Sequence, residues 1–472
     1  MPGWTRPVSY FYPLPFLVAG TAVGSIDRER VRELLGREEA RFVQAHPRSK
    51  ELFERAKGSL LAGVPMNWMV AWAGPFPIFA ASGRGARVKD VEGHTYVDLC
   101  LGDTGSMFGH SPKPAVDAIV RQARRGITMM LPTEDSVWVG EELARRFGLP
   151  YWQVALTATD ANRFAIRLAR EVTRRTKILV YRGCYHGTVD EALIDVKDGA
   201  VVTRGGNIGA PFDPSLTTKA IEFNDVAALE EALAPRDVAC VLAEPAMTNA
   251  GIILPEAGYH DALRRITRAT GTLLLIDETH TISAGPGGYT RAHDLAPDIV
   301  TLGKPIASGI PAAAYGISQE MADRILSRVT GEGADESGIG GTLAGNALAA
   351  AAMRATLEHV ITKEAFDWMI PLAERLEAGV RDVIKAHDVP WNVVRLGARV
   401  EYRFHPVPPR NGGEAEATKD RELDRLVHLF ALNRRILLTP FHNMALVSPA
   451  TTERDVDRHT RVFGALARAL LA

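Results

Sequence analysis

The stretch DIVTLGKPIASGIPAAAYG, residues 298–316, decides the fold class of this chain. Its apolar run at 299–302 indicates a buried strand, which ends in Gly303, Lys304 and Pro305. In an α/β protein, the carboxyl end of such a strand faces the crevice where ligands usually bind. The stretch therefore predicts a lysine amine at the functional edge of a sheet. A surface lysine at a turn is the ordinary alternative.

Outward from this stretch, helical segments alternate with short apolar runs from about residue 112 onward. The runs include KILVYRG (177–183), VACVLAEP (238–245) and LLLIDE (273–278). Buried apolar strands that alternate with helices are typical of a parallel sheet with crossover helices. The sequence therefore predicts an α/β fold with a large central domain, and a smaller α+β domain built from both chain ends.

The pattern divides the chain into five parts. They are an N-terminal arm (1–24), the first part of the small domain (25–110), the large domain (111–345), linking helices (346–385) and the C-terminal part of the small domain (386–472). Alternation in 77–100 predicts short antiparallel strands, and VPPRNGGEAEATKD (407–420) predicts a flexible loop.

Composition excludes several classes of function. The chain has 55 basic and 56 acidic residues among 472, so we expect no broad basic surface for nucleic acid or an anionic membrane. Its three cysteines lie far apart, so a disulfide framework or a metal site is not expected and a cytoplasmic location fits. No apolar run reaches transmembrane length, and Pro13 and Pro15 interrupt the apolar stretch 8–24 that loosely resembles a signal peptide.

Three further features change the interpretation of Lys304. Asp277 ends the apolar run of LLLIDETH, Tyr185 lies between glycines in YRGCYHG, and ALTATDAN places Thr157 and Thr159 where a strand runs into a helix. Each has an ordinary explanation: a core ion pair, a core aromatic ring and helix capping. Taken together, they supply an amine, a carboxylate, a flat ring and an anion cradle, which are the parts that bind pyridoxal 5'-phosphate (PLP).

The chemistry of PLP gives each part a role. Lys304 would form an imine with the aldehyde and later move protons at a substrate carbon. Asp277 would keep the ring nitrogen protonated, so that the ring accepts electrons. The phosphate would anchor the cofactor while covalent bonds are exchanged.

These motifs, in this order, resemble the class III, fold-type I aminotransferases over about residues 50–465. The likeness rests on GHTYVDL, YHGTVDEAL, IDETHT, PDIVTLGKPIASGIP and GTLAGN, and it lies near the branch of glutamate-1-semialdehyde aminomutase and β-amino-acid aminotransferases. It implies a large domain with a mainly parallel seven-stranded sheet, PLP as cofactor and a homodimer. The residues that it assigns to the cofactor are Ala158, Thr159, Tyr185, Glu244, Asp277, Thr279, Lys304 and Thr342.

Within this resemblance the roles are specific. Ala158 and Thr159 would hold the phosphate, Tyr185 and Thr279 would lie on the two ring faces, and Glu244 would line the site. Thr342 would reach the phosphate of the partner subunit. Ala158 stands where the family usually has glycine, so we expect it to adopt a backbone conformation that glycine accepts more freely.

The substrate site departs from the family pattern, since an arginine that is common after the Asp-Glu-Thr motif is missing. We expect Arg403 to bind a substrate carboxylate, with Arg399 on the same strand face as the lesser candidate. Trp68 and Trp72 in the apolar segment 63–77 are predicted to form a pocket for a bulky or aromatic group, and core packing is the alternative. His442 is a further substrate candidate.

The sequence thus predicts an aminotransferase that moves an amino group from an amine or (β-)amino acid to a keto acid by a ping-pong mechanism. An aminomutase or an amino-acid racemase of the same fold is the alternative. A non-catalytic ligand-binding protein and a cofactor-free lysine aldolase also stay open, although the latter leaves Asp277 and the anion cradle without a role. Donor and acceptor are not determined.

Overall fold

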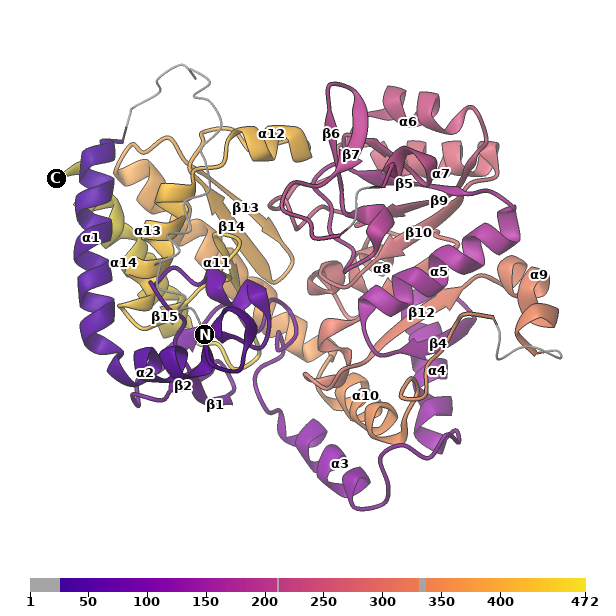
Figure 1. Cartoon of the computed structure of the whole chain (residues 1–472), viewed down its shortest axis with the longest axis horizontal. Coiled ribbons are helices and arrows are strands. Elements are labelled where there is room, and N and C mark those ends of the chain that lie inside the picture. The colour runs from indigo at the N-terminus through magenta and orange to yellow at the C-terminus, as the bar shows by residue number, and fades with distance from the viewer. Residues whose placement is uncertain (1–25, 210–211, 331–336) are drawn as a thin grey trace, which may run out of the picture.

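The computed structural model describes residues 26–209, 212–330 and 337–472. The expected N-terminal arm, residues 1–24, lies outside these described residues. Figure 1 shows two lobes: one contains a large sheet with helices on both sides, and the other contains smaller sheets and both described ends of the chain.

The larger lobe contains the seven-stranded sheet in the order β4-β12-β11-β10-β9-β5-β8. Its strands are β4 (Tyr151–Ala155), β5 (Lys177–Tyr181), β8 (Thr218–Ile221), β9 (Val238–Ala243), β10 (Leu273–Asp277), β11 (Ile299–Leu302) and β12 (Ala313–Ile317). Strand β12 runs antiparallel to both of its neighbours, and the other pairs are parallel. The predicted mainly parallel α/β sheet is confirmed.

Both faces of this sheet are buried. In β5, Ile178 and Val180 belong to a core with α5 (Ala158–Thr173) and α9 (Gln319–Thr330), whereas Leu179 and Tyr181 face a core with α6 (Val226–Leu233) and α7 (Tyr259–Thr270). Successive strand residues point to opposite faces, so an all-apolar strand requires cover on both sides. The remaining elements of this lobe are α3 (Lys113–Ala123), α4 (Glu134–Phe147), β6 (Ile194–Lys197), β7 (Ala200–Thr203) and α8 (Gly288–Ala292).

The smaller lobe joins the two ends of the chain. One sheet has the order β1-β2-β3-β15 and the other β13-β14-β16. The elements are α1 (Arg28–Ala45), α2 (Pro47–Ala56), β1 (Ala80–Arg84), β2 (Arg87–Asp90), β3 (Thr95–Asp98), β13 (Asn392–Leu396), β14 (Arg399–Arg403), α13 (Arg421–Leu432), β15 (Ile436–Leu437), β16 (Met444–Leu446) and α14 (Glu453–Leu471). Strand β3 pairs with β15, and α1 packs on α13, so neither end forms this lobe alone.

The two helices predicted as a link fall on opposite sides of the lobe boundary. Helix α10 (Ala347–His359) packs on α3 and α4, whereas α11 (Lys363–Ala386) packs on α14 and β13. The chain therefore crosses between the lobes in the short connection between α10 and α11.

The prediction of a flexible loop at 407–420 is wrong in part, because α12 (Gly412–Ala417) forms there. The Asn411 side chain accepts a hydrogen bond from the Glu414 amide, which caps this short helix. Gly412 packs so closely on the Arg182 carbonyl that a Cβ atom would overlap it. The helix thus forms because the large lobe holds it, a contact that the local sequence does not reveal. No helix within the described ranges is long and apolar enough to span a membrane.

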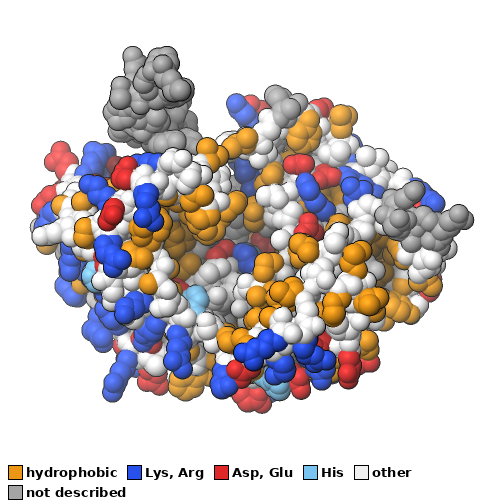
Figure 2. Space-filling model, turned by 60° about the horizontal axis from the view of Figure 1, so that its bottom comes forward, with side chains coloured by type: hydrophobic (Ala, Val, Ile, Leu, Met, Phe, Trp, Pro, Cys, Tyr) orange, Lys and Arg blue, Asp and Glu red, His pale blue; other side chains and the backbone are white. Residues whose placement is uncertain are grey.

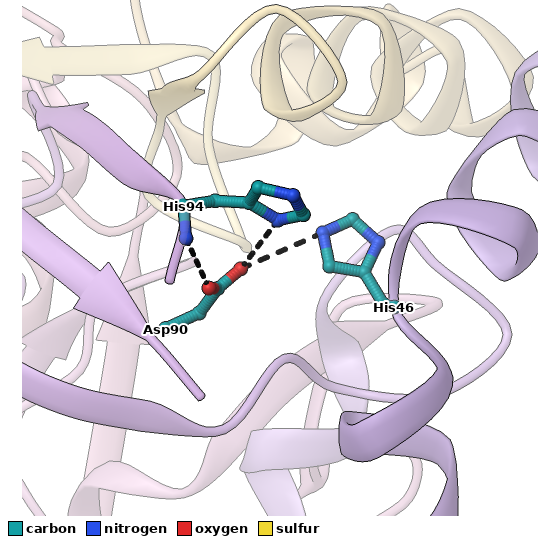
Figure 3. A group of neighbouring side chains, drawn as sticks. All are labelled: His46, Asp90 and His94. Atoms are coloured by element: carbon teal, nitrogen blue, oxygen red, sulfur yellow. Dashed lines mark hydrogen bonds and ion pairs between the residues drawn. The ribbon is translucent and has the colours of Figure 1, made fainter. Parts of the chain in front are cut away.

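Three side chains of the small lobe, His46, Asp90 and His94, lie within reach of one another (Figure 3). Within the described ranges, this is the group of histidine and acidic side chains that comes close enough to share a metal ion. Sequence spacing did not predict it. However, each group already has protein partners: His94 Nδ1 lies 3.1 Å from Asp90 Oδ2, and His46 Nδ1 lies 2.8 Å from the Phe42 carbonyl.

The buried Tyr96 hydroxyl completes this network. It lies 2.8 Å from His46 Nε2 and 2.7 Å from Asp90 Oδ2. Burial of a carboxylate is tolerated where hydrogen bonds replace water. We interpret the group as a hydrogen-bonded network that fixes the turn between β2 and β3 against α1.

Tyr96→Phe is expected to lower the free energy of unfolding by about 1–3 kcal/mol, because buried groups of His46 and Asp90 lose a partner. Urea unfolding followed by circular dichroism measures this change. Tyr151→Phe is the control, since its hydroxyl donates to Gln319 Oε1 at 3.0 Å on the exposed surface. Equal stability of Tyr96→Phe and the wild type, or a zinc-dependent rise in melting temperature that His94→Ala removes, would contradict this interpretation.

Candidate active site

Lys304 lies where the sequence places it, just beyond the carboxyl end of β11. Strand β11 pairs in parallel with β10, and Asp277 lies opposite Thr301 in the register. Lys304 has φ of 49°, in the left-handed region that residues with a Cβ atom rarely occupy. Such conformations concentrate at functional sites, where the surrounding structure maintains them.

A cavity of about 330 Å³ opens beside this lysine. Its lining includes most of the predicted cofactor residues: Ala158, Thr159, Tyr185, Glu244, Asp277, Thr279 and Lys304. The structure therefore brings together residues that are up to 146 positions apart, from 158 to 304, at one edge of the sheet.

Asp277 forms the carboxylate end of the cavity. Its Oδ2 atom lies 2.9 Å from His186 Nδ1 and accepts a hydrogen bond from Asn162 Nδ2 at 2.9 Å, and its Oδ1 atom accepts from the Thr279 amide at 3.0 Å. Burial alone would raise the pKa of Asp277. The hydrogen bond and charge of His186, together with the hydrogen bonds from Thr279 and Asn162, outweigh burial and lower this pKa below its usual value. The carboxylate therefore stays charged, as it must to hold a protonated ring nitrogen.

The N-terminus of α5 forms the anion end. Thr157 caps the helix by accepting from the Asp160 amide, and the next two residues line the cavity. Amide groups in the first turn of a helix favour anions. Gly187 packs directly on Thr159, where a Cβ atom would overlap the Thr159 hydroxyl. The Thr188 amide donates to that hydroxyl at 3.1 Å, which holds the two segments together.

The expectation of a glycine-like backbone at Ala158 is wrong. Ala158 is the first residue of α5 and has an ordinary helical conformation. Its methyl group faces Gly303 instead, where an added Cβ atom would lie 3.1 Å from the Ala158 Cβ. The methyl group of Ala158, which the glycine usual in the family lacks, therefore fits because residue 303 is a glycine.

The arrangement fits PLP. Tyr185, with 39% of its surface exposed, and Thr279 line the space between the anion end and the carboxylate. The buried atoms Thr279 Oγ1 and His186 Nε2 have no hydrogen-bond partner within the described ranges. An amine, a charged carboxylate, a helix N-terminus and these unpaired polar atoms surround one cavity, as a phosphorylated pyridine aldehyde requires.

The structure does not bring the predicted substrate residues to this cavity. Arg403 and His442 line a neighbouring cavity of about 410 Å³ between the lobes. Arg403 Nη1 donates to the Ala250 carbonyl at 2.8 Å, so the Arg403 guanidinium already has a hydrogen-bond partner in the protein. Trp72 packs on the small-lobe core that contains Phe42, and Trp68 packs edge-on against Phe441 at 6.0 Å between ring centroids. The alternative of core packing fits Trp72.

Thr342 lies in an exposed turn before α10 and does not line the cavity of its own subunit. A role toward a partner subunit therefore stays a prediction.

Sequence reasoning missed three residues around the lysine. Asp103 Oδ2 lies 2.8 Å from Lys304 Nζ, His280 Nε2 lies 2.7 Å from the same nitrogen, and Thr104 follows Asp103 in the loop after β3. His280 directly follows the predicted Thr279, so its place beside the site could have been predicted from the sequence. Asp103 is 201 positions from Lys304, and nothing local to it indicated a contact.

Arg399, the lesser sequence candidate, lies closer to the lysine network than Arg403 does. Its buried guanidinium donates to Thr104 Oγ1 at 2.6 Å and to Ser283 Oγ at 3.2 Å. Burial of an arginine among uncharged partners is costly. This cost indicates a function for Arg399 beyond packing.

Comparison with known proteins agrees with this geometry. The family model "Aminotransferase class-III" matches residues 69–423. A glutamate-1-semialdehyde 2,1-aminomutase of Persephonella marina is 32% identical over 420 residues, 87% of this chain and 96% of the relative. The solved structure of a glutamate-1-semialdehyde aminomutase from Pseudomonas aeruginosa PAO1 is 50% identical, with a TM-score of 0.92 over 94% of this chain and 99% of that one.

Two other solved structures extend the comparison. A lysine-to-alanine variant of the Pseudomonas protein is in complex with PMP. A β-phenylalanine aminotransferase from Variovorax paradoxus is 26% identical, with a TM-score of 0.82 over 92% of this chain and 97% of that one.

Gly187→Ala is expected to weaken PLP binding on the order of tenfold, because its methyl group must displace Thr159 at the anion end. Titration of the apoprotein with PLP, followed by absorbance, measures this affinity. Gly199→Ala is the matched control: Gly199 has a similar φ, 78° against 80°, but no atom within 4 Å of an added Cβ. Equal PLP affinity in Gly187→Ala and the control would contradict the proposed cradle.

Proposed function

Because the chain belongs to the class-III aminotransferase family and is PLP-dependent, we propose that it is an aminomutase, which relocates an amino group between carbons of one small substrate. The observation that carries this proposal is the 50% identity, over 94% of the chain, with the Pseudomonas glutamate-1-semialdehyde aminomutase. Two transaminases, from Sphaerobacter thermophilus and Variovorax paradoxus, are more distant, at 27% and 26% identity. This reverses the order of the two alternatives that the sequence suggested.

PLP, when bound, supplies an aldehyde that takes up the amino group and a ring that accepts electrons. The chain supplies the rest. The N-terminus of α5 would hold the phosphate, and Asp277, kept charged by His186, would hold the proton on the ring nitrogen. Tyr185 and Thr279 would line the two faces of the ring. Lys304 Nζ would bind the aldehyde carbon and move protons at the substrate carbons.

An aminomutase returns the amino group to the molecule that donated it. It therefore needs no second substrate, whereas a transaminase must release one product before it binds a keto acid.

The segment 63–77 contains no arginine or lysine that could bind a substrate carboxylate. We propose that Arg399, rather than Arg403, provides the positive charge near a substrate carboxylate, since β14 carries it to the side of His280.

An aminotransferase is the second candidate function. The specific observation in its favour is the likeness of the whole fold to transaminases, with TM-scores of 0.82 for those from Sphaerobacter thermophilus and Variovorax paradoxus. In that case the donor is an amine or amino acid and the acceptor a keto acid.

We also propose a homodimer, in which Thr342 reaches the cofactor of the partner subunit. Several large apolar side chains near this turn are exposed: Ile127, Met129, Met130, Leu131 and Leu343. Figure 2 shows hydrophobic side chains grouped on the surface of the larger lobe. Burial of such a group against a second copy removes apolar surface from water. Light scattering should give twice the chain mass. A cytoplasmic location stays a prediction.

One experiment separates the two functions. The yellow holoenzyme is mixed with glutamate 1-semialdehyde, with amines, and with α- and β-amino acids, each with and without a keto acid. An aminomutase converts its substrate fully without the keto acid. Strict dependence on a keto acid supports the aminotransferase, and no spectral change with any amino compound would refute both.

Lys304→Ala is expected to abolish turnover, because within the described ranges Lys304 supplies the one amine that lines the cavity. Borohydride reduction followed by peptide mapping should find PLP on Lys304 in the wild type and on no peptide of the variant. Lys113→Ala, on the exposed surface of α3, is the control and should keep full activity. Retained turnover in Lys304→Ala would refute the assignment of this residue.

A further inference from the structure

Lys304 is the end of a continuous chain of hydrogen bonds that the general chemistry of PLP does not require. His280 Nε2 lies 2.7 Å from Lys304 Nζ, and His280 Nδ1 lies 2.9 Å from Thr104 Oγ1. Arg399 Nη2 donates to the same hydroxyl at 2.6 Å. The four residues come from both lobes and meet only in the folded chain.

The backbone is strained to form this arrangement. Asp103 and Thr104 have φ of 49° and 84°, and Lys304 has φ of 49°. Positive φ is rare for a β-branched residue such as threonine. The fold thus maintains three residues of positive φ around this hydrogen-bond chain, which indicates that their side-chain positions matter for function.

Asp103 pairs with Lys304, and this pairing affects how the lysine nitrogen can react. The Oδ2 atom of Asp103 lies 2.8 Å from Nζ. Burial alone would raise the pKa of Asp103, but the charge and hydrogen bond of Lys304, together with neighbouring histidines, outweigh burial and lower this pKa. The carboxylate and the lysine nitrogen are close enough to form an ion pair. An ammonium nitrogen has no free electron pair and cannot bond to an aldehyde carbon. A neighbouring group must therefore take the proton.

We propose that His280 is the proton acceptor of Lys304, which activates the lysine nitrogen to bind the aldehyde carbon of the cofactor. The Nζ–H bond breaks and a proton is added to His280 Nε2. The electron pair left on Nζ then bonds to the aldehyde carbon. The two remaining amine hydrogens leave with the aldehyde oxygen as water, and a C=N bond remains. His280 returns its proton when an incoming amine displaces the lysine.

The hydrogen-bond directions support this role. The Lys304 ammonium can only donate, so the adjacent Nε2 must accept. A neutral imidazole then carries its hydrogen on Nδ1, which donates to Thr104 Oγ1. The second lone pair of that oxygen accepts from Arg399, which also can only donate. Thr104 thus holds the His280 ring with its free electron pair directed at Nζ.

Burial and the nearby positive charges keep the His280 imidazole unprotonated, so the lone pair of Nε2 is free. Burial lowers the pKa of His280 well below its ordinary value, and the positive charges of Lys304 and Arg399 lower it further, while Asp103 and Asp277 oppose this shift. The imidazole is therefore unprotonated near neutral pH. Once Nζ loses its charge, the main repulsion on a protonated His280 disappears.

This inference rests on the proposed role of Lys304, and His280→Gln tests it. The full-length apoprotein is mixed with PLP, and stopped-flow absorbance follows formation of the C=N bond. We expect a rate about 100-fold below that of the wild type at pH 7, since proton transfer by a positioned side chain contributes on this order. His405→Gln, at a partly exposed histidine of the small lobe, is the matched control and should bind at the wild-type rate.

The pH profile separates proton transfer from a structural effect. In His280→Gln, hydroxide must take the proton, so the rate should rise about tenfold per pH unit and approach that of the wild type. A uniform loss at every pH, or an unchanged rate at pH 7, would overturn the inference. If the wild type forms no C=N bond at Lys304, both this inference and the proposed function fail. If the wild type forms that bond and His280→Gln forms it at an equal rate, only this inference fails.

Thr104→Val is the second variant, in case glutamine at position 280 prevents folding. It keeps His280 but removes the acceptor for Nδ1–H, so the ring is no longer held. We expect a smaller loss of rate with the same rise toward high pH. A Thr104→Val variant that binds PLP as fast as the wild type at pH 7 would contradict the role of the hydrogen-bond chain.

Discussion

The parallel pairing of β10 with β11 is the constraint on which the site depends. Parallel strands end at the same edge of a sheet, so Asp277 and Lys304 emerge side by side although 27 positions separate them. The crossover through α8 sets that spacing. The N-terminus of α5 and the segment around Tyr185 follow β4 and β5 at the same edge, which completes the cavity from elements that share one direction.

Two charged side chains near the site, Asp277 and Arg399, are buried. Asp277 is held by Asn162 of α5 and by His186 in the loop after β5. Asn162 in turn accepts from Thr301 of β11 at 2.6 Å. Hydrogen bonds that satisfy a buried carboxylate offset the cost of removing it from water. Arg399 differs, because its partners are uncharged. A buried cation of this kind is costly for folding alone and is consistent with a site that receives an anion.

The two lobes are coupled through that same arginine. Strand β14 belongs to the small lobe, yet Arg399 reaches Ser283 and Thr104 and lies 3.4 Å from His280. A movement of one lobe relative to the other would therefore change the hydrogen bonds around Lys304. The position of β14 itself depends on both chain ends, since the small lobe forms only when β3 pairs with β15 and α1 packs on α13.

The sequence by itself determined the sheet, the strand-end positions of Lys304 and Asp277, and the helix N-terminus at Thr157, because periodicity and capping are local properties of the chain. Only the tertiary structure decided that Asp103, Thr104 and His280 surround the lysine, that Arg399 lies nearer than Arg403, and that Ala158 keeps a helical backbone. These depend on contacts between segments up to about 300 positions apart, such as Arg399 with Thr104, and on positive φ angles imposed by those contacts. Long-range packing leaves no mark in a short stretch of sequence, which is why local patterns predicted the cofactor site better than the residues that surround its lysine.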